Sequence, residues 1–581
     1  MKSNNSGNEI RAYIYSDVPP TAEQTARFSA FIAGKYGLEL TPEWIQSDQY
    51  KGGFCLSVGQ DVYDWSERGR LKQLKRKLKN AALSGEVIPL IRKAVEEFSP
   101  EIIADEHGQV LEVGDGIAVC SGMSGAAYGE IIVFQSGVRG MVQDLREDSV
   151  GCIVFGDLET VSAGDIVYRT GRTAGIPVGE GFLGRVVDAL GSPIDGGPPI
   201  TPEGYRQIEA PAPGIVDRQP VNKPMETGLL VVDSMFPIGR GQRELIIGDR
   251  QTGKTALAID TLINQKGKDV VCIYVAIGQK TSSVARLYET LKQKGAADYT
   301  IIVSASAGEP ASIQYIAPYA GAALGEYFMY SGRDVLIIYD DLSKHAVAYR
   351  TLSLLLERAP GREAYPGDVF YLHSRLLERA ARLSDELGGG SMTALPIVET
   401  QAGDVSAYIP TNIISITDGQ LFLESELFFE GQRPAVNVGL SVSRVGGAAQ
   451  TKALKKASGA LRLELAQYRE MEVFSQFSSD LDEATKKRLQ YGQGLMRLMR
   501  QPQYSPYTQA EETALLVAAL NKVMQDVPAN KINTFAKGML TYLKQHIPDV
   551  MDTIQASKTL TSDDQSAIIH AAKEYLKEFN G

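Results

Sequence analysis

One segment constrains the fold of this chain most: residues 248–255, which read GDRQTGKT. They fit the pattern G-x-x-x-x-G-K-[ST], whose glycines let backbone N–H groups wrap around phosphates. In that pattern the lysine reaches the β- and γ-phosphates and the last hydroxyl binds Mg²⁺. The apolar run 245–247 precedes the segment and a helical pattern over 256–264 follows it. This order of strand, loop and helix predicts a nucleotide-binding α/β domain.

Buried strands recur on both sides of that loop. Their continuous β-branched composition is typical of strands covered on both faces, and so of a parallel α/β sheet. The run 335–339 ends at Asp340, whose carboxylate can hold the water shell of Mg²⁺ or, alternatively, cap the helix expected over 342–350. The runs are 245–247, 270–275, 301–303, 335–339 and 413–416.

The regions before and after this domain differ from it in their residue patterns. Short glycine-punctuated strands before the loop region suggest a small barrel or sandwich, and Leu/Ala/Glu/Lys periodicity after it predicts helices. At the N-terminus, a capping box at 21–24, a helix ending at Gly37 and an alternating strand at 54–58 indicate a small α+β unit. The predicted domains are a small α+β unit (1–85), a helical linker (86–108), a β-barrel (109–199), a RecA-like α/β P-loop domain (200–452) and a C-terminal helical bundle (453–581).

Composition narrows the function classes. Asp and Glu number 70 against 59 Lys and Arg, and the resulting charge of −11 disfavours indiscriminate nucleic-acid binding. The four cysteines are far apart and form no C-x-x-C pair, so neither a zinc site nor a disulfide framework is indicated. No window reaches the ~18–20 apolar residues of a membrane span, and the first 11 residues carry no targeting pattern. We therefore expect any work at a membrane to go through partners.

Four motifs in order resemble the α-subunit family of F-type ATP synthases, from about Glu112 to the C-terminus. The resemblance implies a barrel, a RecA-like domain and a helical bundle, with ATP or ADP and Mg²⁺ as cofactors. Thr255 and Asp340 would bind the metal, Asp340 through water. The motifs are GDRQTGKT (248–255), YDDLSK (339–344), GREAYPGDVF (361–370) and PAVNVGLSVS (434–443). The implied phosphate-loop residues are Gly248, Asp249, Arg250, Gln251, Thr252, Gly253, Lys254 and Thr255.

Gln279 decides between the two subunit types of that family. A catalytic subunit carries a glutamate at this position to activate the attacking water, and glutamine cannot act as a base. We therefore expect this chain to bind ATP tightly and to hydrolyse it poorly. A self-sufficient hexameric RecA-like motor would need the missing glutamate.

Two further groups of residues follow from the resemblance. Arg444 would stabilise phosphoryl charge in a neighbouring catalytic site, with Ser441 supporting its loop; a structural ion pair is the alternative for Arg444. A purely structural paralogue would have no use for such an arginine. Around the chain's own nucleotide the resemblance places Phe428, Arg433, Gln501 and Gln503, with the two glutamines near adenine. The alternative for the glutamines is that they are ordinary polar residues on the surface.

The first ~85 residues exceed the family's usual length. Residues 49–76 resemble the C-terminal part of the δ subunit of the same enzyme, which ties the head to the peripheral stalk. The basic helix expected over 70–79 would then meet an acidic stalk helix; a solvated face and an anionic-membrane or nucleic-acid contact are the alternatives.

Taken together, the resemblance implies a noncatalytic subunit of a rotary enzyme. Its partners would be β subunits in an α3β3 hexamer, the γ shaft, and the δ and b subunits of the stalk. The complex would couple ATP synthesis or hydrolysis to ion translocation, with protons as the expected ion. The location would be the cytoplasmic face of the bacterial plasma membrane, reached only through F0.

Overall fold

The computed structural model describes residues 12–47, 50–58, 61–71, 104–156, 158–475 and 482–580. It divides into two compact units, Met1–Ala174 and Gly175–Gly581, each of which is described by itself. The expectations for residues 1–11, for the basic helix beyond 71 and for the linker over 86–103 lie outside the described residues.

The N-terminal unit begins with a small α+β module, as predicted. Its strands run in the order β2-β1-β3-β4, with β2 parallel to β1 and the other pairs antiparallel. Helix α1 begins at the Thr21 capping box and ends at Gly37, whose φ of 67° suits glycine. Its elements are β1 (Ala12–Ser16), α1 (Ala22–Tyr36), β2 (Glu43–Gln46), β3 (Cys55–Val58) and β4 (Asp61–Asp64).

A closed six-stranded barrel follows and confirms the predicted barrel. Its order is β10-β7-β8-β9-β6-β5, and pairing of β10 with β5 closes it. Val110, Ile132, Cys152 and Val167 lie among the buried residues that fill it. The strands are β5 (Ala104–Gly114), β6 (Ile117–Ser121), β7 (Glu130–Phe134), β8 (Arg139–Leu145), β9 (Val150–Phe155) and β10 (Ile166–Thr173).

Both predicted boundaries of the barrel need correction. Residues 104–108, assigned to a helical linker, begin β5, whose backbone pairs with β4 from Tyr63↔Ala104 to Asp61↔Glu106. That partner lies about 40 residues earlier in the chain, so no local pattern indicated it. The barrel also ends at Thr173 rather than 199, because β12 (Val186–Asp188) pairs with the parallel sheet of the second unit.

The nucleotide-binding domain is built on an eight-stranded sheet, β12-β16-β15-β17-β18-β14-β19-β20. Every neighbouring pair is parallel except β19 with β20. Its strands are β14 (Leu245–Gly248), β15 (Val270–Gln279), β16 (Thr300–Ser306), β17 (Asp334–Asp340), β18 (Ser391–Glu399), β19 (Gly419–Leu423) and β20 (Val442–Ser443); a separate pair is β11 (Gly175–Val178) with β13 (Gly204–Gln207).

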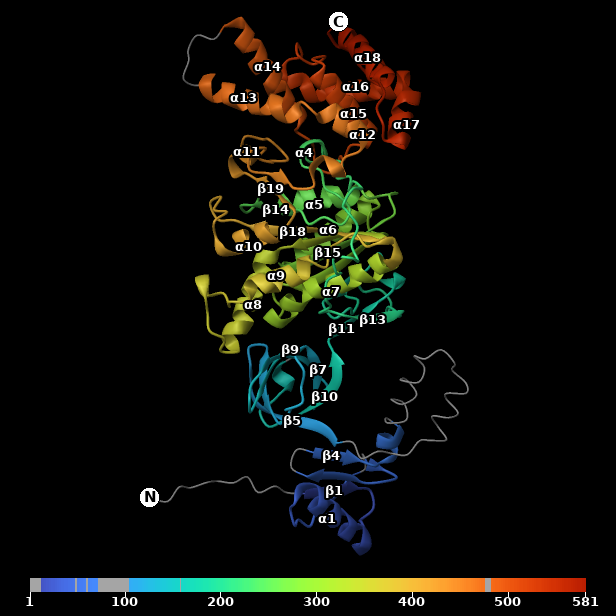
Figure 1. The fold of residues 1–581 in the computed structure, drawn as a ribbon, viewed down its shortest axis with the longest axis vertical. Coiled ribbons are helices and arrows are strands. Elements are labelled where there is room, and N and C mark those ends of the chain that lie inside the picture. The colour runs from blue at the N-terminus through green and yellow to red at the C-terminus, as the bar shows by residue number, and fades with distance from the viewer. Residues whose placement is uncertain are drawn as a thin grey trace. The chain divides into compact units, whose positions relative to one another are not determined.

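Helices cover both faces of this sheet, as a doubly covered parallel sheet requires. In Figure 1, α5 and α6 lie on one face and α7, α8 and α9 on the other. The helices are α4 (Leu230–Met235), α5 (Lys254–Ile263), α6 (Thr281–Lys294), α7 (Ala311–Tyr330), α8 (Leu342–Leu355), α9 (Val369–Leu377), α10 (Tyr408–Ile416) and α11 (Ser425–Phe429).

One predicted strand is a helix. The run 413–416 forms the end of α10, and the strand of this region is β19, three residues further on. Four apolar residues fit a buried helix turn as well as a short strand, so periodicity could not separate the two.

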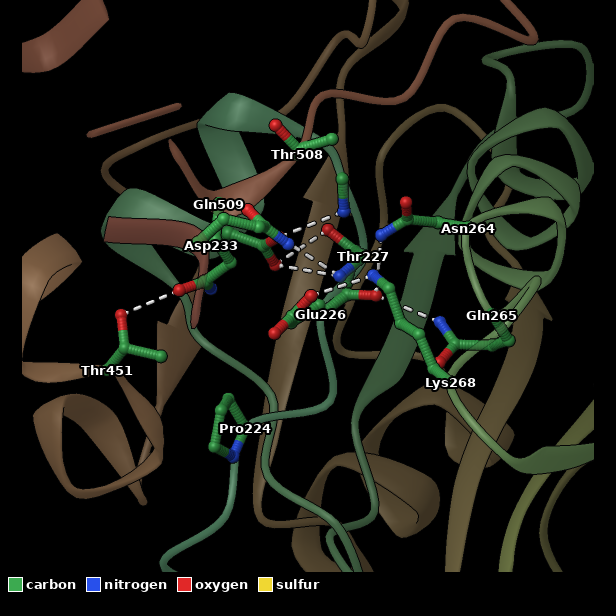
Figure 2. A network of polar contacts seen from close by, with 12 residues as sticks. Pro224, Glu226, Thr227, Asp233, Asn264, Gln265, Lys268, Thr451, Thr508 and Gln509 are labelled. Carbon is green, nitrogen blue, oxygen red and sulfur yellow. Dashed lines mark hydrogen bonds and ion pairs between the residues drawn. The ribbon is translucent and has the colours of Figure 1, made fainter. Parts of the chain in front are cut away.

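The C-terminal domain is helical, as predicted, and shares a continuous apolar core with the nucleotide-binding domain. A polar network lies where the two domains meet, and Figure 2 shows part of it: Asp233 of α4 accepts from Thr227 and Gly228, while Thr451 donates to Gln509 at 2.7 Å. Lys558 of the C-terminal domain pairs with Glu226 of the nucleotide-binding domain at 3.0 Å. Among the described residues, no helix is both long and apolar enough to cross a membrane. The helices are α12 (Lys452–Ser458), α13 (Leu461–Ser475), α14 (Glu483–Leu498), α15 (Gln509–Leu520), α16 (Ile532–His546), α17 (Pro548–Ser557) and α18 (Ser562–Asn580).

Candidate functional site

The phosphate loop runs from the end of β14 to the start of α5, in the predicted order. A Cβ at Gly248 would lie 2.3 Å from the carbonyl oxygen of Leu423, so only glycine fits against β19. Gly253 has φ 94°, a left-handed conformation that glycine adopts without strain. These two glycines let the loop turn from the sheet directly into the N-terminus of α5, where backbone N–H groups and the helix dipole favour an anion.

Lys254 points back into this loop. Its Nζ donates to the carbonyl oxygen of Gly248 at 2.8 Å and also to that of Asp249, and the residue is 6% exposed. Burial lowers the pKa of Lys254, while the nearby carboxylates of Glu399, Asp341 and Asp340 oppose that shift. An ammonium has three donors, so one remains for a phosphate oxygen.

The acidic partner of the loop is Asp340 at the end of β17. Thr255 Oγ1 donates to Asp340 Oδ2 at 2.8 Å, and the Tyr274 hydroxyl donates to the same oxygen at 2.5 Å. The alternative role of Asp340 as a helix cap is wrong: Asp341 caps α8 by accepting from the Lys344 N–H. Burial raises the pKa of Asp341 to about 6.

The Thr255 and Asp340 oxygens are the kind of ligands that Mg²⁺ prefers. The described residues contain no cluster of three or more His, Cys, Asp or Glu side chains that could hold a metal by itself. A Mg²⁺ ion here would therefore complete its shell with phosphate oxygens and water, as is usual for this ion.

Gln279 lies at the end of β15, beside Asp340. Its Nε2 donates to the backbone carbonyl oxygen of Asp340 at 3.3 Å. The side chain at this position of the site is therefore an amide that orients by hydrogen bonding and cannot take a proton from water.

The remaining residues of the phosphate loop stabilise its conformation. The Asp249 carboxylate accepts from Thr400, Gly403 and Ser425, and these bonds lower its pKa against the effect of burial. Thr252 Oγ1 donates to the Asp249 carbonyl, and Gln251 takes a positive φ of 64°. Arg250 reaches across the site to Glu399, at 3.0 Å, from a side chain that is 81% exposed.

Of the four residues expected around the nucleotide, two lie beside the loop. The Arg433 guanidinium stacks over the Phe428 ring at 4.3 Å, and that ring lies 3.6 Å from the Cβ position of Gly253. The Gln501 amide is instead used by the backbone: it donates to the carbonyls of Gly228 and Ser505 and accepts from the Leu230 N–H. Gln503 is exposed.

Arg444 lies at the other end of the sheet. It follows β20, whose Ser443 pairs with Gly419 at the start of β19, while Gly248 of the phosphate loop pairs with Leu423 at the end of β19. Four residues of strand separate these points, roughly 13 Å at ~3.3 Å per residue. Ser441 is buried and its hydroxyl accepts from the Phe422 N–H, so it anchors the Arg444 segment to β19.

Sequence reasoning missed two polar residues of the site. Tyr274 stands inside the apolar run 270–275, and no local signal distinguishes it from the apolar residues around it. Glu399 directly ends the buried strand β18, as Asp340 ends β17, and that same signal could have found it.

Comparison with protein families assigns four segments of the chain. Residues 228–443 match the ATP synthase alpha/beta family nucleotide-binding domain, 450–575 its C-terminal domain and 103–171 its beta-barrel domain. Residues 2–78 match the ATP synthase delta (OSCP) subunit family. The barrel match ends close to Thr173, in agreement with the structure.

Curated relatives match the same region. ATP synthase subunit alpha of Caldanaerobacter subterraneus subsp. tengcongensis is 59% identical over 494 residues, which are 85% of this chain and 98% of that protein. The subunits alpha of Clostridium botulinum (strain Hall) and Clostridium acetobutylicum are 57% and 56% identical over the same shares. The chain therefore belongs to the ATP synthase alpha/beta family as an alpha subunit, and it carries an N-terminal domain of the delta (OSCP) family.

Proposed function

We propose that this chain is the noncatalytic nucleotide-binding subunit of a rotary F1 head. It holds ATP or ADP with Mg²⁺ in its own site and supplies Arg444 to a neighbouring β subunit. Gln279 is the observation that carries the first half, because the site has an amide where a base would have to stand.

The position of Arg444 supports the second half. It lies about a strand's length from the phosphate loop of its own chain, too far for a direct contact with phosphates bound there. It is also exposed, so a phosphate on another subunit can reach it. An arginine supplied across an interface stabilises the charge that develops during phosphoryl transfer.

In its own site, Lys254 and the N–H groups of the loop would bind the phosphates, and Thr255 and Asp340 would hold Mg²⁺. The metal would neutralise phosphate charge and fix the nucleotide's orientation. Phe428 and Arg433 border the loop and would contact the nucleotide from the side of α11. Gln501 would act indirectly, by clamping the segment 501–505 to the loop at 228–230.

The assembly follows from the subunit type. The chain would alternate with β subunits in an α3β3 hexamer around γ, and its delta-like domain would join δ and b in the peripheral stalk. It would reach the cytoplasmic face of the plasma membrane through F0 and take part in proton-coupled ATP synthesis. A chain lacking residues 1–71 should still support ATP hydrolysis in α3β3γ but bind the stalk subunits more weakly; unchanged stalk binding would refute this role.

The test of the proposed function is reconstitution with the cognate β and γ subunits. Arg444→Ala should lower the turnover of the complex by ~10³-fold or more, in line with other arginines that act in trans. Arg27→Ala is the matched control, because Arg27 is exposed and pairs with Glu23 in the same helix. Turnover within twofold of wild type for the Arg444 variant would refute the assignment, as would steady hydrolysis by the isolated chain that Lys254→Ala abolishes.

A further inference from the structure

Glu244 is a buried carboxyl group that the phosphate site does not use. It directly precedes β14 and is 0% exposed. Its Oε2 accepts a hydrogen bond from Gln242 Nε2 at 2.7 Å, whereas Oε1 has no hydrogen-bond partner in the described part of the chain. A buried acceptor without a hydrogen bond lowers the free energy of unfolding by about 1–3 kcal/mol, so a functional role would explain why a carboxyl group stands here.

The carboxyl lies against the segment that carries Arg444. A Cβ at Gly419 would be 2.5 Å from Glu244 Oε2 and 2.9 Å from Oε1, so the carboxyl occupies the space that a side chain would fill there. The neighbouring Asp418 accepts the backbone N–H of Arg444 at its carbonyl oxygen, at 2.8 Å. Glu244 thus lies at the point where the Arg444 segment joins β19.

Charge connects the two residues as well. Burial raises the pKa of Glu244 well above its ordinary range and Asp418 adds to that rise, while the hydrogen bond from Gln242 and the positive charge of Arg444 oppose it. The other arginine nearby, Arg243, is already held by the Asp418 carboxylate at 2.9 Å and by Glu378. Among the described residues, Arg444 is therefore the cation that we assign to Glu244.

We propose that Glu244 is the positioning residue of Arg444: once the neighbouring subunit is in place, the unpartnered Oε1 accepts from the guanidinium and so fixes the direction in which the arginine faces that subunit. The inference rests on the proposed function of Arg444. A guanidinium has five N–H donors, so one bond to Glu244 leaves a second edge for phosphate. A carboxyl group keeps acceptor capacity in either protonation state. An arginine held in one orientation also loses less side-chain entropy when it meets its phosphate.

The experiment measures ATP hydrolysis by α3β3γ complexes that contain Glu244→Gln. In this variant the glutamine oxygen must face the Gln242 donor, so its NH2 group takes the place of Oε1 and cannot accept from the guanidinium. We expect kcat to fall ~10-fold while KM changes less than twofold, because the arginine acts on the transition state rather than on ATP binding. Glu512→Gln is the matched control: Glu512 on α15 is likewise a buried carboxyl group, 1% exposed, and it faces Asp233 rather than Arg444. We expect the control to keep wild-type kcat.

A double mutant separates this inference from the proposed function. Glu244→Gln added to Arg444→Ala should cause no further loss, because Glu244 then has nothing to position. A tenfold loss that persists in the Arg444→Ala background, or wild-type kcat for Glu244→Gln, would overturn the role of Glu244 while leaving Arg444 in place. Wild-type kcat for Arg444→Ala would instead overturn the proposed function itself.

A second variant covers the case in which Glu244→Gln fails to assemble. Glu244→Asp keeps the carboxyl but withdraws it by one methylene, so the same kcat loss is expected at unchanged KM. Wild-type kcat for an assembled Glu244→Asp complex would contradict the inference.

Discussion

Tyr274→Phe tests how the acidic side of the nucleotide site is held in place. The Tyr274 hydroxyl donates to Asp340 Oδ2 at 2.5 Å, and Thr255 donates to the same oxygen at 2.8 Å. The tyrosine is 3% exposed, so the substitution removes one oxygen atom from a packed site and leaves the ring. Asp340 then loses one of the two side-chain donors that orient its carboxylate.

The size of the effect follows from that bond. A hydrogen bond to a charged group contributes about 1.5–3 kcal/mol. If about 1.4 kcal/mol of this appears in the affinity for the magnesium nucleotide, Kd rises ~10-fold, and the upper limit corresponds to ~100-fold. Binding of ATP without Mg²⁺ should change less than twofold, because Asp340 would contact the nucleotide only through the metal.

The assay is equilibrium binding of ATP to the purified chain, with Mg²⁺ or with a chelator present. Tyr299→Phe is the matched control, because the Tyr299 hydroxyl donates to the carbonyls of Leu262 and Ile263 at the far end of α5. An equal loss of affinity with and without Mg²⁺ for Tyr274→Phe would show that the hydroxyl supports the fold and does not orient the metal ligand. Unchanged affinity in both conditions would refute the reasoning altogether.

Two further predictions concern stability. Burial lowers the pKa of His373 to about 3, so below pH 6.5 the unfolded chain binds a proton that the folded chain excludes; stability therefore falls by ~1.4 kcal/mol per pH unit, or ~2 kcal/mol at pH 5. His373→Leu should remove this acid penalty, which urea unfolding at pH 7.5 and pH 5 will show; an equal pH dependence in the variant would contradict it. Gln501→Ala should destabilise the chain by ~2–3 kcal/mol through the loss of three hydrogen bonds to buried backbone, whereas Gln503→Ala should change unfolding by less than ~0.5 kcal/mol. Equal effects of the two substitutions would refute this division of roles.

The phosphate loop and Asp340 could be predicted because their signals are local. A glycine pattern between a strand and a helix, and an acid at the end of an apolar run, can be recognised without tertiary information. The structure shows that Asp341 caps α8 and that Asp340 accepts from Thr255. The sequence could not distinguish these two adjacent residues.

The wrong barrel boundaries and the missed role of Tyr274 have a common physical cause, which is pairing with distant segments. Residues 104–108 are polar and mixed, and they form a strand because 104–106 pair with β4 and 107–108 pair with β10. Val186–Asp188 falls within the range predicted for the barrel (109–199), yet it pairs with β16 of the nucleotide-binding domain. Tyr274 gains its role only from Asp340 on the neighbouring strand β17.

The central claim is that this chain binds nucleotide at one end of its sheet and serves a neighbour's chemistry from the other. The most direct measurement compares the initial ATP hydrolysis rates of two α3β3γ complexes, one with Lys254→Ala and one with Arg444→Ala. We expect the Lys254 variant to keep most of the initial rate while the Arg444 variant loses ~10³-fold or more. Loss of turnover in the Lys254 variant with a normal rate in the Arg444 variant would contradict it.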